Sequence, residues 1–209
     1  MTTRRLPTRV ALAAAAFAIV PGSAACSDEG DHMGADGSMM GGGLPAESTA
    51  PSSAGDHDQA DVMFSMMMVP HHLQAIEMAD LAPTRSTDPE LLALARQIKA
   101  AQQPEVDTMT TWLASWGAEP MMGHEPSAPH GGGMNGMVTA DELRELGALE
   151  GEAFDRRWLE LMVEHHEGAV DMAEDVIAAG RHAPTRALAV AIIEAQQTEI
   201  AQMKAMLAG

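Results

Sequence analysis

The sequence predicts an all-α protein, a four-helix bundle built from two repeated αα-hairpins. Three observations predict this fold class. Apolar residues recur three and four positions apart within residues 60–116 and 152–208, as they do on one face of a helix. Runs that alternate apolar and polar residues, as β-strands do, are almost absent. Two segments of the chain also resemble each other at a constant offset of 94 positions.

The repeat is clearest at two pairs of adjacent histidines, because His71-His72 matches His165-His166 at this offset. The same offset relates Met68 to Met162, Met78 to Met172, Gln102 to Gln196, Glu105 to Glu199 and Met109 to Met203. An offset that stays constant through all these pairs is hard to obtain by chance. It predicts two structurally equivalent halves, each with two helices.

The first hairpin is predicted from its helix start and stop signals. A helix is expected over residues 60–82 and should end at Pro83, because proline lacks the N–H that continues the helix. Asp88 is a favoured N-cap residue, and Pro89 suits the first position of the second helix. Pro70, inside the first helix, should bend its axis near the histidines.

The second hairpin has the same kind of signals. The sequence TADE at residues 139–142 is a capping box and predicts a short helix before the repeat. A long helix is expected from about Glu152 to Ala179, with Gly180 as its stop, and the last helix should begin near Pro184 and end the chain. The four long helices can bury their apolar stripes only against one another, which predicts one bundle.

Residues 1–26 have the pattern of a secretory signal peptide. Three arginines precede an apolar run over residues 10–20, which is too short to cross a bilayer, and small residues lead to Cys26. This position favours lipidation of Cys26, although Ser23 stands where lipoprotein signals usually have a branched aliphatic residue. We therefore expect an exported protein, anchored by a lipid on the outer side of the cell membrane, or otherwise periplasmic or secreted. Cys26 is the only cysteine, which excludes an intrachain disulfide.

Two further segments have too few large apolar residues to fold alone. Residues 27–59 are expected to form a flexible tether, and residues 117–138 a Gly/Pro-rich linker within the bundle domain of residues 60–209. The linker carries side chains that can capture a soft ion loosely, although biased composition explains them equally well. They are Met121, Met122, His124, His130, Met134 and Met137.

The chain is strongly acidic, with 30 acidic and 12 basic residues and a formal net charge of -18. Removing residues 1–26 takes away three basic residues and no acidic one, which leaves a net charge near -21. Such a surface repels nucleic acid and anionic lipid headgroups and attracts cations. We therefore expect no nucleic-acid partner and no membrane attachment except through the lipid. Solubility outside the cell explains the charge equally well.

Both histidine pairs fall on faces that are otherwise apolar. The first face carries Phe64, Met68, His71, His72, Ala75, Met78, Ala79 and Ala82, and its equivalent carries Trp158, Met162, His165, His166, Ala169, Met172, Ala173 and Val176. Glu105 and Glu199 interrupt the apolar faces of the second and fourth helices. A buried carboxylate needs a partner, and the histidines are the only basic groups on these faces. The pattern predicts a layer of histidine and glutamate inside the bundle.

Met68-x-x-His71 and Met162-x-x-His165 each place a sulfur and a nitrogen on one side of a helix. A methionine stripe is usually core filler, and a single inward histidine is usually a hydrogen-bonded core residue. Filler has no reason to repeat this pattern on two equivalent faces. Thioether and imidazole together suit copper(I), with silver(I) as its mimic, and zinc is the runner-up through histidine and carboxylate. The carboxylates can accept the second ring N–H of a ligating histidine.

The paired stretches MMMVPHHLQAIEMA and LELMVEHHEGAVDMA, each followed by a QQxE helix, resemble the bacterial family called domain of unknown function 305, which includes CopM-like copper-binding proteins. The resemblance covers about residues 60–208. It implies a ferritin-like helical bundle, an exported or surface location, and copper binding linked to copper tolerance. The implied metal ligands are Met68, His71, His72, Met78, Met162, His165, His166 and Met172, and Glu105, Glu199, Met109 and Met203 are expected around them.

Three functions are compatible with these features. The favoured one is a non-enzymatic protein that sequesters copper(I) at the cell envelope or transfers it to a copper-transfer partner. One alternative is a ferritin-like metal-dependent oxidoreductase. In di-iron bundles, however, Glu-x-x-His supplies a hard oxygen where this chain has Met-x-x-His, and we assign no catalytic residue. The other alternative is a methionine-rich structural or oxidant-absorbing envelope lipoprotein.

Overall fold

The computed structural model describes residues 57–122 and 136–209. The predicted signal peptide with Cys26, nearly all of the tether and the middle of the linker lie outside these residues. The described residues form five helices and no strand: α1 (Gln59–Arg85), α2 (Pro89–Trp116), α3 (Ala140–Ala148), α4 (Gly151–Ala179) and α5 (Ala183–Ala208). The predicted all-α fold class is confirmed.

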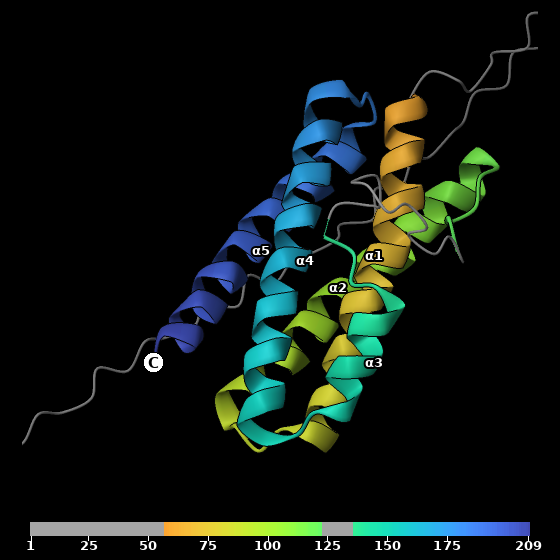
Figure 1. Cartoon of the computed structure of the whole chain (residues 1–209). Helices are drawn as coiled ribbons and strands as arrows, with labels where there is room; N and C mark the ends of the chain where they lie inside the picture. Colours follow the sequence, from red (N-terminus) through yellow and green to blue (C-terminus); the bar gives the residue numbers. More distant parts are fainter. Residues whose placement is uncertain (1–56, 123–135) are drawn as a thin grey trace, which may run out of the picture. The chain divides into compact units, whose positions relative to one another are not determined.

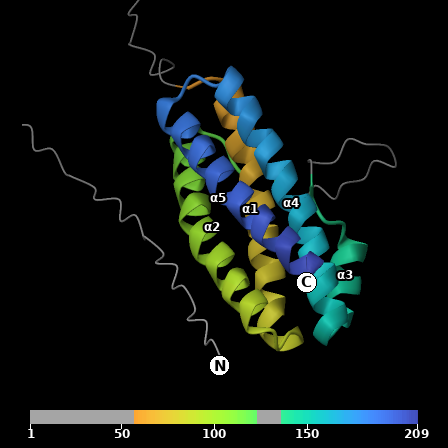
Figure 2. The same ribbon diagram turned by 90° about the vertical axis from the view of Figure 1, so that its left-hand side faces the viewer.

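The four long helices form the two predicted hairpins. α1 packs along α2 and α4 packs along α5, and the hairpins meet where α1 lies beside α4 (Figures 1 and 2). The start of α1 and the end of α4 share one core cluster, so these two helices run in opposite directions. The short helix α3 contacts both α1 and α4. None of the helices in the described part of the chain is long and apolar enough to cross a membrane.

Most helix ends have the predicted capping residues. Asp88 accepts hydrogen bonds from two N–H groups at the start of α2, and Thr139 and Glu142 form the predicted capping box of α3. α4 and α5 each begin one residue before the predicted start. At the end of α2, Gly117 adopts φ 70°, a left-handed conformation that favours glycine.

The prediction that α1 ends at Pro83 is wrong, because the helix continues to Arg85. A proline in the last turn removes a single hydrogen bond, and the Pro83 side chain is exposed there. The last turn is closed instead by the N–H of Ser86, which donates to the carbonyl of Ala82 at 2.9 Å.

α1 also continues through Pro70, whose missing N–H leaves the carbonyl of Met66 without its helical donor. That carbonyl accepts a hydrogen bond from the N–H of Met121 at 3.0 Å. The proline therefore creates an acceptor that holds the chain after α2 against α1, one turn before His71. The predicted bend of the axis at Pro70 stays a prediction.

The core consists of two apolar clusters that follow the sequence repeat. The Phe64 cluster includes Met68, Val106, Met109, Met172 and Ile192, and the Trp158 cluster includes Met78, Ile98, Phe154, Met162 and Met203. Phe64 and Trp158 are themselves equivalent at the 94-residue offset. In α4 the two clusters use residues on opposite sides of His165-His166, so the histidines lie between them.

Asp61 ties the start of α1 to the turn between α4 and α5. Its buried carboxylate accepts hydrogen bonds from the N–H groups of Arg181 and His182, both at 3.0 Å, and from that of Asp58 at 2.9 Å. Gly180 is needed beside it, because a Cβ there would lie 2.5 Å from Asp61 Oδ1. Burial by itself would raise the pKa of Asp61, but these backbone hydrogen bonds outweigh burial and lower the pKa.

Replacing Asp61 with alanine should lower the free energy of unfolding by about 1–3 kcal/mol at neutral pH, because buried N–H groups lose their acceptor. The pKa of Asp61 is lowered on folding. Its stabilisation is therefore present above the unfolded pKa, about 3.9, and lost as pH falls through the folded pKa. The measurement is urea denaturation of the parent and Asp61→Ala at several pH values.

Asp80→Ala is the matched control, because Asp80 is exposed and forms a surface ion pair with the exposed Lys99. We expect it to change the free energy of unfolding by less than about 1 kcal/mol. Equal losses in the two variants would contradict the role given to Asp61.

Candidate metal centre

Four fully buried histidines form a polar layer at the middle of the bundle: His71 and His72 on α1, and His165 and His166 on α4. Adjacent residues on a helix point about 100° apart, so both can be buried only if the helix is covered on two sides. α1 is covered by α2 and α4, and α4 by α5 and α1. Each histidine pair therefore has one ring toward its own hairpin partner and one toward the other hairpin.

The outer histidines, His72 and His166, face their own hairpin partners. The Nε2 atom of His72 lies 2.7 Å from Glu105 Oε2 on α2, and that of His166 lies 2.8 Å from Glu199 Oε2 on α5. The predicted layer of histidine and glutamate is thus present. The Glu199 side chain is 4% exposed and that of Glu105 19%, so the second pair is the drier one. Glu199 also accepts a hydrogen bond from Gln97 at 3.2 Å, which links α2 to α5.

The inner histidines, His71 and His165, meet across the α1–α4 interface. Their ring centroids are 3.7 Å apart, with 37° between the ring planes. Neither ring nitrogen of His165 has a hydrogen-bond partner among the described residues. Such a group is unusual, because a buried polar atom without a partner destabilises the fold.

The pKa of His165 is held well below its ordinary value. Burial is the largest cause, because it removes water from the charged form, and positive charge on His71, His166 or His72 would add repulsion. A contact with the backbone of His71 opposes the shift only weakly. His165 is therefore neutral near pH 7, with a nitrogen lone pair available to a metal ion.

Gln102 and Gln196 are two further buried polar residues, which entered the sequence-based prediction only as a matched pair of the repeat and not as site residues. They are equivalent at the 94-residue offset, and both are buried. Both polar side-chain atoms of Gln102, and Oε1 of Gln196, lack hydrogen-bond partners in the described part of the chain. The repeated QQxE motif on an apolar helix face could have pointed to these two residues. A buried side-chain amide needs hydrogen-bond partners, and the backbone of a helix does not supply them.

The four predicted methionine ligands are buried, and so are the two methionines expected around them, Met109 and Met203; the structure sorts the six into two trios. Met68, Met109 and Met172 belong to the Phe64 cluster, and Met78, Met162 and Met203 belong to the Trp158 cluster. Each trio takes two residues from one repeat and one from the other. Met68 and Met78, which share one helix, thus lie on opposite sides of the histidines. Sulfur is present above and below the layer.

These residues fit a soft ion better than a hard one. Residues 57–122 and 136–209 contain no group of three or more His, Cys, Asp or Glu side chains arranged to hold a metal ion together. The runner-up metal, zinc, usually takes such a group of ligands. The side chains that are present, buried imidazoles between two methionine trios, match the neutral nitrogen and thioether ligands that copper(I) prefers.

Fold and site together define an all-α bundle of two repeated hairpins with a histidine layer between two methionine trios. The chain belongs to the family named domain of unknown function 305 (DUF305), whose profile matches residues 61–207. A search of curated proteins found no match.

Solved structures of this family are similar to the chain. A DUF305 protein from Streptomyces coelicolor is 35% identical, with a TM-score of 0.63 over 71% of this chain and 92% of that one. A DUF305 fragment from Deinococcus radiodurans is 31% identical, with a TM-score of 0.64 over 72% and 97%. CopM in its Cu(I)-bound form is 34% identical, with a TM-score of 0.57 over 70% and 94%. CopM has also been solved in Cu(II)-bound and silver-bound forms.

Leucine substitutions should distinguish the two kinds of histidine. His166→Leu leaves the Glu199 carboxylate buried without its histidine, so the free energy of unfolding of the metal-free protein should fall by roughly 3 kcal/mol. His165→Leu removes a ring without hydrogen bonds and should change it by less than about 1 kcal/mol. Urea denaturation measures both, and a larger loss for His165→Leu would contradict the assignment of His165 as the unsatisfied ring.

The lowered pKa of His165 predicts a pH dependence of stability. Below about pH 6.5 the unfolded chain protonates this residue while the folded chain does not. The free energy of unfolding should therefore fall on acidification, by up to about 1.4 kcal/mol per pH unit for this group, until the folded pKa is reached. Because His165→Leu lacks this contribution, it should gain stability relative to the parent between about pH 7 and pH 5. Parallel pH curves would show that His165 titrates normally in the folded protein.

Proposed function

We propose that this protein binds copper(I) in the histidine layer, and that it sequesters copper at the cell envelope or passes it to a copper-transfer protein. The observation that carries the proposal is His165, a buried imidazole whose two nitrogens lack partners among the described residues. A buried polar group that costs stability points to a role other than folding. A metal ion would satisfy its lone pair.

The charges around the layer favour a monovalent ion. Imidazole and thioether ligands are neutral, so they add no charge to the dry interior of the bundle. Glu105 and Glu199 contribute negative charge one imidazole away, and each can accept the ring N–H of a histidine whose other nitrogen binds metal. Silver(I) should bind in the same way, because it shares the charge and softness of copper(I).

The relatives support both parts of the proposal. CopM was solved with copper(I), copper(II) and silver bound, and about 34% of its aligned residues are identical to this chain. The Streptomyces coelicolor relative is described as secreted, which agrees with the predicted signal peptide. Lipidation at Cys26 is part of the proposal, since a lipid anchor would keep the bound copper at the membrane surface.

Copper(I) titration against a competing chelator, without oxygen, tests the ligands. Combined replacement of Met68 and Met162 with leucine, or of His71 and His165 with alanine, should weaken binding at least about tenfold, as loss of site residues commonly does. Affinity should also fall below about pH 6, because protons compete for imidazole nitrogen. His57→Ala and Met206→Leu are controls, since neither residue lies in the layer or the trios. Parent-like affinity in both ligand variants would remove the assignment.

We infer that the protein holds its ion without catalysing a reaction. Oxygen-activating bundles use several carboxylate ligands, whereas here Glu105 and Glu199 are each engaged by a histidine. The copper-loaded protein, incubated with oxygen and ascorbate, should consume no more oxygen than the same copper held by the chelator. Sustained turnover that disappears in His71→Ala/His165→Ala would instead support a metal-dependent oxidoreductase.

A further inference from the structure

We propose a second soft-cation site, a shallow pocket at the solvent edge of the α1–α4 interface in which Met63, Met67 and Met172 bind one copper(I) or silver(I) ion on its way to the histidine layer. This inference rests on the proposed function and adds the route by which the ion reaches the layer.

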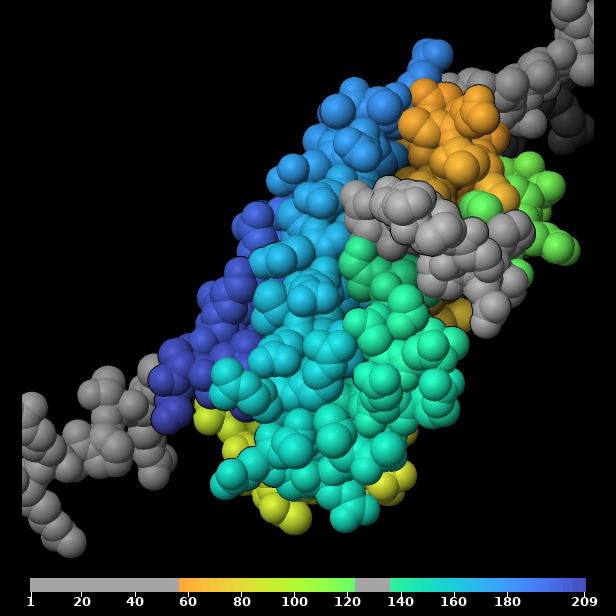
Figure 3. All heavy atoms as spheres, in the orientation of Figure 1, coloured from red at the N-terminus to blue at the C-terminus, as the bar shows by residue number. Residues whose placement is uncertain are grey.

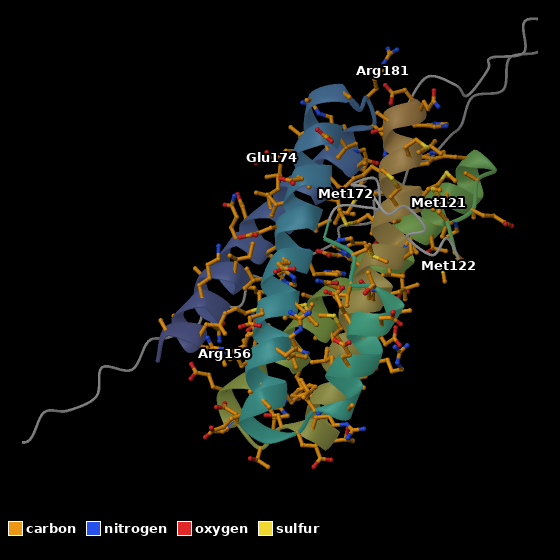
Figure 4. The ribbon with its side chains drawn as sticks, in the orientation of Figure 1. Met121, Met122, Arg156, Met172, Glu174 and Arg181 are labelled. Carbon is orange, nitrogen blue, oxygen red and sulfur yellow. The ribbon has the colours of Figure 1, made fainter. Side chains whose placement is uncertain are left out.

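The pocket is a cavity of about 170 Å³ between the first half of α1 and the last part of α4. Its lining includes three thioether side chains, Met63, Met67 and Met172, and the exposed carboxylate of Asp175. Met63 is 37% exposed, while Met172 is 7% exposed, so the three sulfurs extend from the surface into the core. Figure 4 places Met172 on the side of α4 toward α1.

The pocket lies on the same stripes as the inner histidines. Met63, Met67 and His71 are four residues apart along α1, so they share one face and each step covers about 6 Å. On α4, Met172 and His165 are seven residues apart, two turns along one face. Met172 also belongs to the trio with Met68 and Met109. A row of methionine sulfurs therefore runs from solvent toward the neighbouring rings of His71 and His165.

The equivalent position in the other repeat is lined and covered differently, and the difference argues against simple core filling. At the 94-residue offset, Met63, Met67 and Asp175 correspond to Arg157, Leu161 and Leu81. There α3 covers the interface: Leu146 is fully buried in the Trp158 cluster, and Glu142 pairs with Arg157 at 3.1 Å. Figure 3 shows α3 over the lower part of α1. The position under α3 has Leu161, whereas the equivalent position in the pocket has Met67. Leucine or a polar residue at the pocket would serve folding equally well.

The chemistry of the pocket selects the same class of ion as the layer. Three neutral thioethers bind soft monovalent cations and bind calcium, magnesium or zinc poorly. The Asp175 carboxylate and the formal net charge of -18 raise the local concentration of cations. A partly exposed site has fewer ligands fixed in place than the layer, so we expect it to bind more weakly and exchange faster, as a loading site must.

The test compares the full chain with Met63→Leu/Met67→Leu, which keeps the apolar volume and removes two sulfurs. The control Met66→Leu/Met206→Leu removes two other partly exposed methionines, neither of which lines the pocket. With methyl-labelled methionine and silver nitrate in chloride-free buffer, the NMR signals of Met63, Met67 and Met172 should shift in the parent. By native mass spectrometry, the pocket variant should bind one silver ion fewer than the control.

Stopped-flow transfer of copper(I) from a chelator should also be several times slower into the pocket variant, with the same final occupancy of the layer. Silver stoichiometry and transfer rate equal to those of the control would overturn the pocket and leave the proposed function intact. The histidine ring signals report separately on the layer. If silver(I) shifts the pocket methyl signals but never the ring signals, the pocket stands and the proposed function fails.

Discussion

Burial of four imidazoles in the middle of an apolar bundle is the constraint on which the rest of this structure depends. Two adjacent histidines can both be buried only on a helix that is covered on two sides, so α1 and α4 must face each other and also their own hairpin partners. The outer rings find carboxylates at 2.7 and 2.8 Å. The inner rings find each other at 3.7 Å, and His165 is left without a hydrogen bond from the described residues. Folding therefore pairs the outer rings of the layer with carboxylates, while His165 at its centre keeps two ring nitrogens without partners among the described residues.

The sequence repeat makes the two halves of the histidine layer similar. Elements that occur in only one half, such as α3, make the surroundings of the layer different on its two sides. Glu105 in one hairpin matches Glu199 in the other, and the two methionine trios match each other in the same way. This is expected when two equivalent units pack antiparallel. α3 closes the interface over one half, whereas the other half keeps a pocket lined by methionine. Near the half with the pocket, Pro70 leaves the carbonyl of Met66 without a helical donor. That carbonyl accepts a hydrogen bond from the N–H of Met121, near the start of the Gly/Pro-rich linker. The two halves of the interior are thus covered differently, by α3 over one and by the rim of a methionine-lined pocket at the other.

Much of the fold was predictable because its signals are local. The 94-residue offset, the caps at Asp88 and Thr139, and the stop at Gly180 each depend on a few neighbouring residues. Pro83 misled the prediction because a proline near a helix end costs one hydrogen bond, which packing and the Ser86 cap outweigh. The sequence did not reveal which histidine of each pair faces which helix, or that each methionine trio combines both repeats. Both features depend on the antiparallel packing of α1 against α4. The spacing of residues along a single helix gives no information about that packing.

The same burial that lowers the pKa of His165 bears on which cation the proposed site would accept. Protonation of the inner pair would place like charges on rings 3.7 Å apart in a dry interior, and is doubly disfavoured. A divalent ion would bring twice the charge and would require charged or numerous ligands, whereas the carboxylates here are already paired with the outer histidines. A soft monovalent ion meets neither obstacle, because neutral nitrogen and sulfur can hold it while the two glutamates balance its charge through the histidines. Under the proposed function, selection against protons and against hard divalent ions would follow from one physical feature, a dry layer lined with neutral donors.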